Sequence, residues 1–167
     1  MKKLMALFLA GVLMFSFTAC SAVSGSAVYT WLDKTAAALG RSQITSDADL
    51  IGERTVETDA FSGEYTAHCR DDSGRDVIFG GGRIRSGQLF VSGKIRIHEG
   101  SATVIVRINK EKFEIPLKAD GSFSMTLDLQ SGGNYVMIDY DDFTGSAELT
   151  SSYVDDATLL TFTPSIN

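Results

Sequence analysis

The stretch Gln88-Leu-Phe-Val-Ser-Gly-Lys-Ile-Arg-Ile-His98 decides the fold class, because its aliphatic residues recur at every second position. One face of an extended strand therefore carries the aliphatic side chains Leu89, Val91, Ile95 and Ile97. The other face carries the polar side chains Ser92, Lys94, Arg96 and His98. One apolar and one polar face per strand is typical of an antiparallel sheet that covers a core on one side.

The same alternation continues on both sides of this stretch. It predicts strands over 102–108, 112–118 and 122–129, and further strands over 52–57, 61–69, 75–80, 134–140, 145–151 and 158–163. Asn109-Lys-Glu111 and Asp120-Gly121 predict tight turns between alternating runs, and Pro116 favours an edge or a bulge. About nine short strands predict an all-β fold, an antiparallel two-layer β-sandwich of Greek key or jelly roll topology.

Composition limits the possible partners of this 167-residue chain. Its formal net charge of −6 argues against nucleic acid, since a polyanion requires a basic surface. Two cysteines exclude a disulfide-dense scaffold and a four-thiolate zinc site. The length is that of one domain with a single core.

The first twenty residues have the pattern of an export signal. Lys2 and Lys3 precede twelve uncharged residues, 4–15, and a helix of that length covers only about 18 Å. The segment ends Phe17-Thr-Ala-Cys20, which resembles the lipobox of bacterial lipoproteins, although that family has Leu where this chain has Phe17. The resemblance implies cleavage before Cys20, a diacylglycerol on its sulfur and a location on the extracytoplasmic face of the cell membrane. The alternative is an ordinary cleaved signal, with a Cys20–Cys69 disulfide in a secreted protein.

These observations divide the chain into four segments. We expect a signal peptide over 1–19, a lipidated tether over 20–26, a short amphipathic helix over 27–40 and the β-sandwich over 41–167. The helix is predicted by apolar residues at three- and four-residue steps, which are Val28, Trp31, Leu32, Ala36 and Leu39. Gly40 stands where a helix C-cap is expected.

A second resemblance lies in residues 91–150. The quoted motifs are Val91-Ser-Gly-Lys-Ile95, Asp120-Gly-Ser-Phe123, Gly133-Asn-Tyr-Val136 and Phe143-Thr-Gly145. Their spacing resembles carboxypeptidase-regulatory-like and prealbumin-like sandwiches, and is similar to the second half of galactose-binding-like jelly rolls. The resemblance implies an accessory domain of a secreted protein.

No catalytic constellation is visible in the sequence. The two histidines are His68 and His98, and His68 adjoins Cys69. Neighbouring strand residues point to opposite faces, so we expect Cys69 inward and His68 outward rather than one thiol site. No Gly-x-Ser-x-Gly elbow is present, and Gly80-Gly-Gly82 precedes a strand pattern instead of the helix that a phosphate loop needs.

Three groups of residues are candidates for binding. Tyr140 and Phe143, with Tyr153, could stack on sugar rings, although most aromatic residues of a β-protein lie in the core. A basic stripe for acidic glycans or phosphate would consist of Arg83, Arg85, Lys94 and Arg96, which could equally be solvating charges. Calcium is the one candidate cofactor, with Asp139, Asp141 and Asp142 as ligands, and the alternative is a solvated acidic cluster.

The sequence therefore predicts a lipid-anchored extracytoplasmic binding or assembly module that is not an enzyme. Its partners would be the membrane, through lipid on Cys20, and a protein or glycan at the cell surface. One alternative is an envelope-tethered carbohydrate-binding domain that uses calcium. Another is a surface hydrolase, which would need His68 or His98 in a cleft beside a hydroxyl or thiol.

Overall fold

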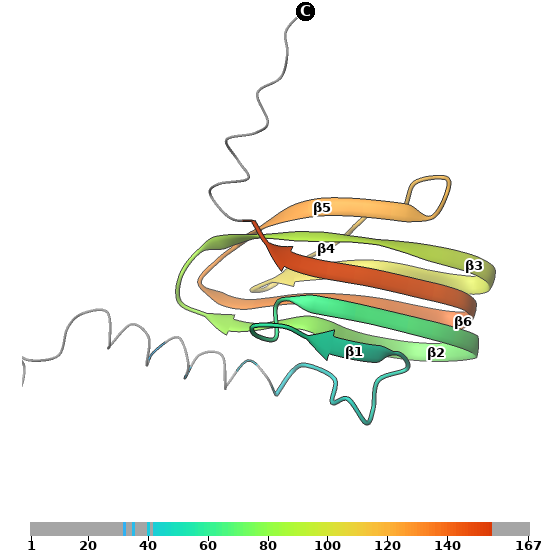
Figure 1. Ribbon diagram of the computed structural model, residues 1–167, viewed down its shortest axis with the longest axis horizontal. Coiled ribbons are helices and arrows are strands. Elements are labelled where there is room, and N and C mark those ends of the chain that lie inside the picture. The colour runs from blue at the N-terminus through green and yellow to red at the C-terminus, as the bar shows by residue number, and fades with distance from the viewer. Residues whose placement is uncertain (1–31, 33–34, 36–39, 41, 155–167) are drawn as a thin grey trace, which may run out of the picture. The chain divides into compact units, whose positions relative to one another are not determined.

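The computed structural model describes residues 32, 35, 40 and 42–154, and its strands form one antiparallel sheet (Figure 1). The strands are β1 (Glu53–Val56), β2 (Gly63–Arg83), β3 (Gly87–Ile108), β4 (Glu111–Glu114), β5 (Ser122–Leu129) and β6 (Gly132–Tyr153). Their order is β1-β2-β6-β3-β4, and β5 also pairs with β3. Because β6 pairs with both β2 and β3, these two strands join into one sheet only when β6, the last described strand, is in place.

The strands β2, β3 and β6 each bend in the middle, which folds the sheet into two layers (Figure 1). The first layer contains β1, β5 and the halves 63–69, 87–97 and 145–153. The second contains β4 and the halves 74–83, 101–108 and 132–140. Strands predicted as separate neighbours, such as 61–69 and 75–80, are thus two halves of one long strand.

Polar residues and left-handed backbone positions make the bend. Asp71, Gly100 and Asp142 have φ values of 59°, 70° and 46°. A Cβ on Gly100 would lie 2.1 Å from the carbonyl oxygen of Asp142, so glycine is required at this close approach. The Ser73 hydroxyl donates to Asp142 Oδ1 at 3.0 Å and accepts from the Asp142 amide at 2.8 Å, which fixes two of the bent strands together.

The core lies between the two layers. The first layer contributes the buried residues Leu89, Val91, Leu127 and Leu149, and the second contributes Phe79, Val104, Val106 and Ile138. Each of these lies at an inward position of its alternating strand, so the predicted antiparallel two-layer β-sandwich is confirmed.

The two predicted turns have different outcomes. Asn109 has a φ of 56° and joins β3 to β4 in a hairpin, as predicted. Asp120-Gly121 also forms a tight turn, in which the Gly121 amide donates to the Lys118 carbonyl oxygen at 2.9 Å. The strands on its two sides do not pair with each other, however, because β4 and β5 both pair with β3, in different layers. In the run predicted over 112–118, the strand β4 ends at Glu114, and the Ile115 amide still donates to the Val104 carbonyl oxygen at 2.9 Å. The chain leaves the sheet at Pro116 and crosses to the other layer, where β5 begins.

Several predicted segments lie outside the described residues. These are the signal peptide over 1–19, the tether over 20–26, most of the helix over 27–40 and the strand over 158–163. Within the helix range, residues 32, 35 and 40 are described, and all three are helical. In the described part of the chain, no helix combines the length and hydropathy needed to cross a bilayer.

Candidate functional site

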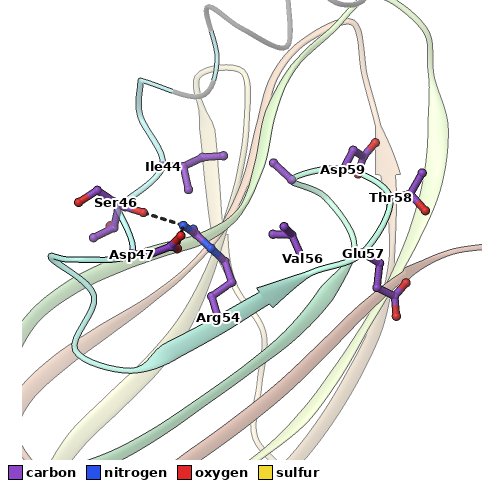
Figure 2. Close-up of a pocket in the computed structure, with 10 residues that line it drawn as sticks. Ile44, Ser46, Asp47, Arg54, Val56, Glu57, Thr58 and Asp59 are labelled. Carbon is purple, nitrogen blue, oxygen red and sulfur yellow. Dashed lines mark hydrogen bonds and ion pairs between the residues drawn. The ribbon is translucent and has the colours of Figure 1, made fainter.

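A groove of about 500 Å³ lies beside β1, between the segments 44–47 and 56–60 (Figure 2). Its floor includes Val56, which is 50% exposed, and its walls carry the polar residues Ser46, Asp47, Glu57 and Asp59. Arg54 enters this groove from β1, although its side chain is only 9% exposed. The groove is therefore built around one nearly buried cation.

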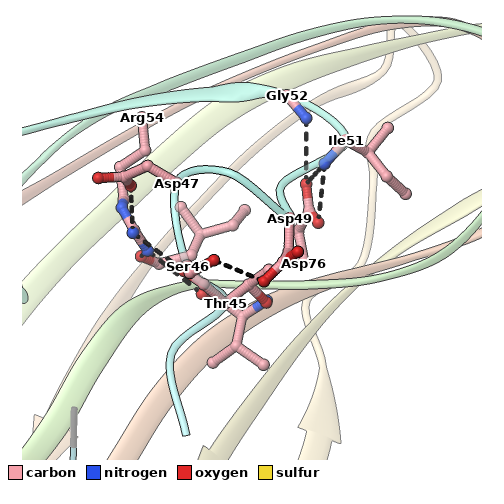
Figure 3. Close-up of polar contacts among 10 residues, drawn as sticks. Thr45, Ser46, Asp47, Asp49, Ile51, Gly52, Arg54 and Asp76 are labelled. Atoms are coloured by element: carbon pink, nitrogen blue, oxygen red, sulfur yellow. Dashed lines mark hydrogen bonds and ion pairs between the residues drawn. The ribbon is translucent and has the colours of Figure 1, made fainter. Parts of the chain in front are cut away.

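Backbone oxygens and one carboxylate hold that cation. Arg54 Nη1 donates to the carbonyl oxygen of Ile78 at 2.8 Å, and Nη2 donates to that of Thr45 at 3.0 Å. Nη2 also donates to Asp47 Oδ1, whose side chain is 77% exposed (Figure 3). Because β1 belongs to the first layer and Ile78 to the second, Arg54 ties the layers together at this side of the sandwich.

A buried polar network lies on the same side of the molecule. Asp76 is 1% exposed and accepts from the amides of Ile51 and Gly52 at 3.0 and 3.2 Å (Figure 3). It also accepts from the Tyr65 hydroxyl at 2.5 Å, which lies 2.9 Å from the Tyr140 hydroxyl. These contacts supply the hydrogen bonds that a buried carboxylate needs.

Burial sets the acidity of the groups around Asp76. Desolvation raises the pKa of Tyr65 and of Tyr140 above their usual range. Desolvation, with a smaller contribution from the charges of Asp72 and Asp76, raises the pKa of the Cys69 thiol to about 11. These groups stay protonated at neutral pH, and the hydrogen bond from Tyr65 to Asp76 joins the first layer to the second.

The outward face of the first layer is lined mainly by hydroxyl groups. Register places nine of them there: Thr55, Thr66, Ser92, Ser122, Ser124, Thr126, Ser146, Thr150 and Ser152. We call these nine residues the hydroxyl face. The Ser92 and Thr150 hydroxyls lie 3.0 Å apart on adjacent strands. Arg96 and Glu148 form an ion pair of 2.8 Å on this face, where Lys94 also lies. The uncharged part of the face is the part around Phe90, where Ser92, Thr126 and Ser152 are its neighbours.

One aromatic ring stands on the hydroxyl face. Phe90 is 40% exposed and lies between Ser152 of β6 and Thr126 of β5. Neighbouring strands are about 4.8 Å apart, so these hydroxyls flank the ring at the width of a sugar residue. Along β3, Gln88 flanks the ring as well, and its amide donates to Asp128 Oδ1 at 2.8 Å.

The predicted stacking residues lie elsewhere. Tyr140 and Phe143 are 4% and 0% exposed, and their rings stack on each other with centroids 5.2 Å apart. They occupy inward positions near the bend, so neither presents a ring to a ligand. The half-buried Tyr153 donates its hydroxyl to Asp59 Oδ2 at 2.7 Å. Phe90, whose ring is exposed, was not among the predicted site residues.

The predicted basic stripe is divided between two places. Arg83 lies at the end of β2, where its guanidinium sits 5.2 Å from the Phe61 ring centroid, and Arg85 follows in the connection to β3. Lys94 and Arg96 lie on the outward face of the first layer, beside Glu148. The four cations therefore do not share one surface.

The three aspartates proposed for calcium point to different partners. Asp139 pairs with Arg75, and Asp142 accepts from Ser73 at the bend, while Asp141 is exposed. Among the described residues, no group of three or more His, Cys, Asp or Glu side chains could hold a metal ion. Calcium at these residues stays a prediction that the described geometry does not support.

The predicted orientation of the His68–Cys69 pair is confirmed. Cys69 is a free, buried thiol at 7% exposure, and His68 is exposed. The glycines at 80–82 form no anion cradle: an ideal Cβ on Gly40 would lie 1.9 Å from the Gly82 amide nitrogen, so the two backbones are in direct contact.

Comparison with known proteins adds little to this geometry. No protein-family model matches the chain, and no curated protein matches it. A solved structure that resembles it is a carbohydrate-binding module from Cellvibrio mixtus lichenase 5A in complex with cellotriose. The identity is 11%, the TM-score is 0.33, and the match covers 70% of this chain and 96% of that one. Similarity at this level assigns neither a family nor a ligand.

Proposed function

We propose that this chain is a non-catalytic binding module, held at the extracytoplasmic face of the cell membrane by lipid on Cys20. The observation that carries the anchor is the sequence Phe17-Thr-Ala-Cys20 behind a short apolar run and two lysines. Each buried methylene contributes about 0.8 kcal/mol, so two or more acyl chains give stable attachment.

The placement of the histidines supports the non-catalytic part of the proposal. His68 and His98 are exposed, and neither lines the groove around Arg54. Cys69, the nucleophile closest in sequence to His68, is buried on the other side of the strand and keeps its proton at neutral pH.

A neutral saccharide is the second candidate, as a ligand of this module. The specific observation is Phe90, an exposed ring with hydroxyl groups on both flanking strands. The apolar face of a sugar ring packs on an aromatic ring, while serine and threonine both donate to and accept from sugar hydroxyls. The side chains directly around Phe90, at Ser92, Thr126 and Ser152, are uncharged, which favours a neutral sugar over an acidic one.

Mass analysis tests the anchor. We expect intact protein extracted from membranes to begin at Cys20 and to carry added diacylglycerol mass there. We expect Cys20→Ser to remove that mass and to leave the protein unprocessed or released into the medium. Ser24→Ala, in the same tether, is the matched control. A wild-type chain with an intact residue 1 and no acyl mass would contradict the proposal.

Titration with neutral oligosaccharides tests the ligand. A glycan array first selects a sugar that the module binds. We expect Phe90→Ala to raise the Kd for that sugar by at least about tenfold, since stacking contributes about 1.4 kcal/mol. Phe113→Ala is the control, because Phe113 of β4 is 39% exposed and lies off the hydroxyl face. Equal affinity of the wild type and the Phe90 variant would remove this site.

A further inference from the structure

The edge strand β5 has one free side (Figure 1). The amide of Ile95 donates to the Gly121 carbonyl oxygen at 2.9 Å, and this bond continues the register of β3 with β5. Hydrogen-bonded pairs alternate in an antiparallel ladder, so the odd-numbered residues of β5 direct their backbone groups toward β3. The backbone N–H and C=O groups of Ser124, Thr126 and Asp128 then point away from the sheet. Among the described residues, these outward groups have no hydrogen-bond partner.

Bonded residues limit this free side at both ends. Before it, the Ser122 carbonyl oxygen accepts from the Lys118 amide at 2.8 Å. After it, the Gln130 amide donates to Asn134 Oδ1 at 2.9 Å, and the Gln130 carbonyl oxygen accepts from Asn134 Nδ2 at 2.8 Å. The free backbone groups of this edge are therefore those of the segment 124–128.

The edge also lacks the features that protect the other edges. β1 and β4 have four residues each, and Pro116 follows β4. β5 has eight residues and pairs with β3 without a register shift. It contains no proline, lysine or bulge, which are the usual means of blocking strand addition.

We propose that β5 pairs with β5 of a second copy of this chain, antiparallel and centred on Thr126, so that two molecules share one continuous sheet. In this register Thr126 lies opposite Thr126 of the second copy, and Ser124 lies opposite its Asp128. A hydrogen-bonded antiparallel pair exchanges both N–H···O bonds, so every outward backbone group of the segment 124–128 gains a partner. The same surface serves both molecules, as in most dimers with a two-fold axis.

The neighbouring registers fit less well. A centre shifted by one residue sets Asp128 opposite Ser122, or Ser124 opposite Gln130, and both Ser122 and Gln130 already use their backbone carbonyl groups. A centre shifted by two residues sets Asp128 opposite Asp120, or opposite Asp128 of the second copy. Like charges directly opposite each other destabilise a strand pair. The register centred on Thr126 avoids both faults.

The side chains of this register are complementary. On the outward face, the Ser124 hydroxyl is placed to donate to the Asp128 carboxylate of the second copy. The two Asp128 side chains are then about 14 Å apart along the strands. On the inward face, Met125, which packs on the core but is only partly buried, lies opposite Leu127 of the second copy. The pairing therefore covers apolar surface without opposing like charges.

The same register aligns the two Phe90 rings. Phe90 of β3 lies opposite Thr126, so one row across the dimer contains both Thr126 residues between both Phe90 residues. The ends of this row are three strand spacings apart, or about 14 Å. A neutral oligosaccharide that reaches both rings should bind the dimer more tightly than the monomer. This consequence rests on the proposed function, whereas the pairing of the β5 strands does not.

Sedimentation of the full chain in detergent, from about 10 µM to about 1 mM, tests the pairing. We expect the wild type to dimerise as its concentration rises. Thr126→Asp opposes two carboxylates at the centre of the interface and should raise the dimer Kd by at least about tenfold. Thr66→Asp is the matched control, because it adds the same charge to the same face on β2, and it should dimerise like the wild type. A monomeric wild type, or equal dimerisation of the two variants, would overturn the proposal.

A mixture of opposite charges tests the position of the axis. Thr126→Lys alone should also be mainly monomeric, because two ammonium groups would then lie opposite each other. An equal mixture of the Thr126→Asp and Thr126→Lys chains should restore the dimer, since each carboxylate then faces an ammonium group. Recovery of the dimer in the mixture is expected only if residue 126 of one copy lies opposite residue 126 of the other. A mixture as monomeric as its two components would contradict the register.

Discussion

The two sides of this sandwich close their edges in different ways. On the β2 side, the second half of the strand ends against side chains and turns: Thr45 bonds the backbone of Val77, Arg54 bonds the carbonyl oxygen of Ile78, and Ala60 accepts from Gly80. On the β5 side, the described residues place nothing against the outward amides of Ser124, Thr126 and Asp128. We call the first the capped edge and the second the open edge.

This difference between the two edges predicts which of them contributes more to the stability of the fold. The capped edge brings residues from five segments together around Arg54 and Asp76, so a change there leaves buried polar groups without partners. The open edge pairs with β3 alone, so a change in its outward backbone groups affects few internal hydrogen bonds. We therefore expect large losses of stability from the first edge and small ones from the second.

The largest loss should follow from Asp76→Ala. It removes the acceptor for two backbone amides and the Tyr65 hydroxyl, and the free energy of unfolding should fall by about 3–5 kcal/mol. Urea unfolding followed by circular dichroism measures this. Asp141→Ala, an exposed carboxylate near the bend, is the control and should lose about 1 kcal/mol or less. Equal losses would show that the buried network does not hold the layers together.

Arg54→Ala should have the next largest effect. The carbonyl oxygens of Thr45 and Ile78 lose a charged donor and the groove widens, which should cost about 2–3 kcal/mol of unfolding free energy. Arg96→Ala also removes an arginine from an ion pair, but both partners are about half exposed, so at most about 1 kcal/mol is expected. If the two variants lost the same stability in urea, Arg54 would be an ordinary surface arginine.

A smaller effect should appear at alkaline pH through Cys69, which is buried beside the capped edge. Its folded pKa of about 11 exceeds its ordinary value of 9.0, so folding favours the protonated thiol. That stability is fully present below pH 9 and is lost as pH rises toward 11. Between about pH 8 and about pH 10.5, the wild type should lose about 2 kcal/mol more than Cys69→Ala. The raised pKa values of Tyr65 and Tyr140 act with the same sign in both chains and cancel in the difference.

Local alternation explains which parts of the fold the sequence could predict. The strand predicted over 122–129 has the same bounds as β5, since its alternation is uninterrupted. The long strands were divided in two because the apolar pattern stops at the bends, where polar residues and left-handed positions stand. Continuity across those bends depends on pairing with β6, which lies far away in sequence.

The candidate sites were less predictable because their signals are not local. Phe90 could have been found, since it is an aromatic residue at a polar-face position of the quoted strand. Arg54 and Asp76 could not, because their burial depends on loops that bring amides and carbonyl groups to them from up to 25 residues away. Tyr140 and Phe143 were assigned to a ligand on residue type alone, which does not distinguish a core ring from an exposed one.

The smallest expected loss of stability comes from a proline substitution on the open edge. Compared with a proline on the capped edge, it tests the difference between the two edges most directly. Proline at Thr126 removes an outward N–H without a described partner, so Thr126→Pro should lower the free energy of unfolding by only about 1 kcal/mol. Val77→Pro removes an N–H that donates to Thr45 Oγ1 at 2.8 Å, and should lose about 1–2 kcal/mol more. Urea unfolding of both variants gives the difference. A loss at Thr126 as large as that at Val77 would mean that the two edges are equally bonded, and the distinction between a capped and an open edge would have to be abandoned.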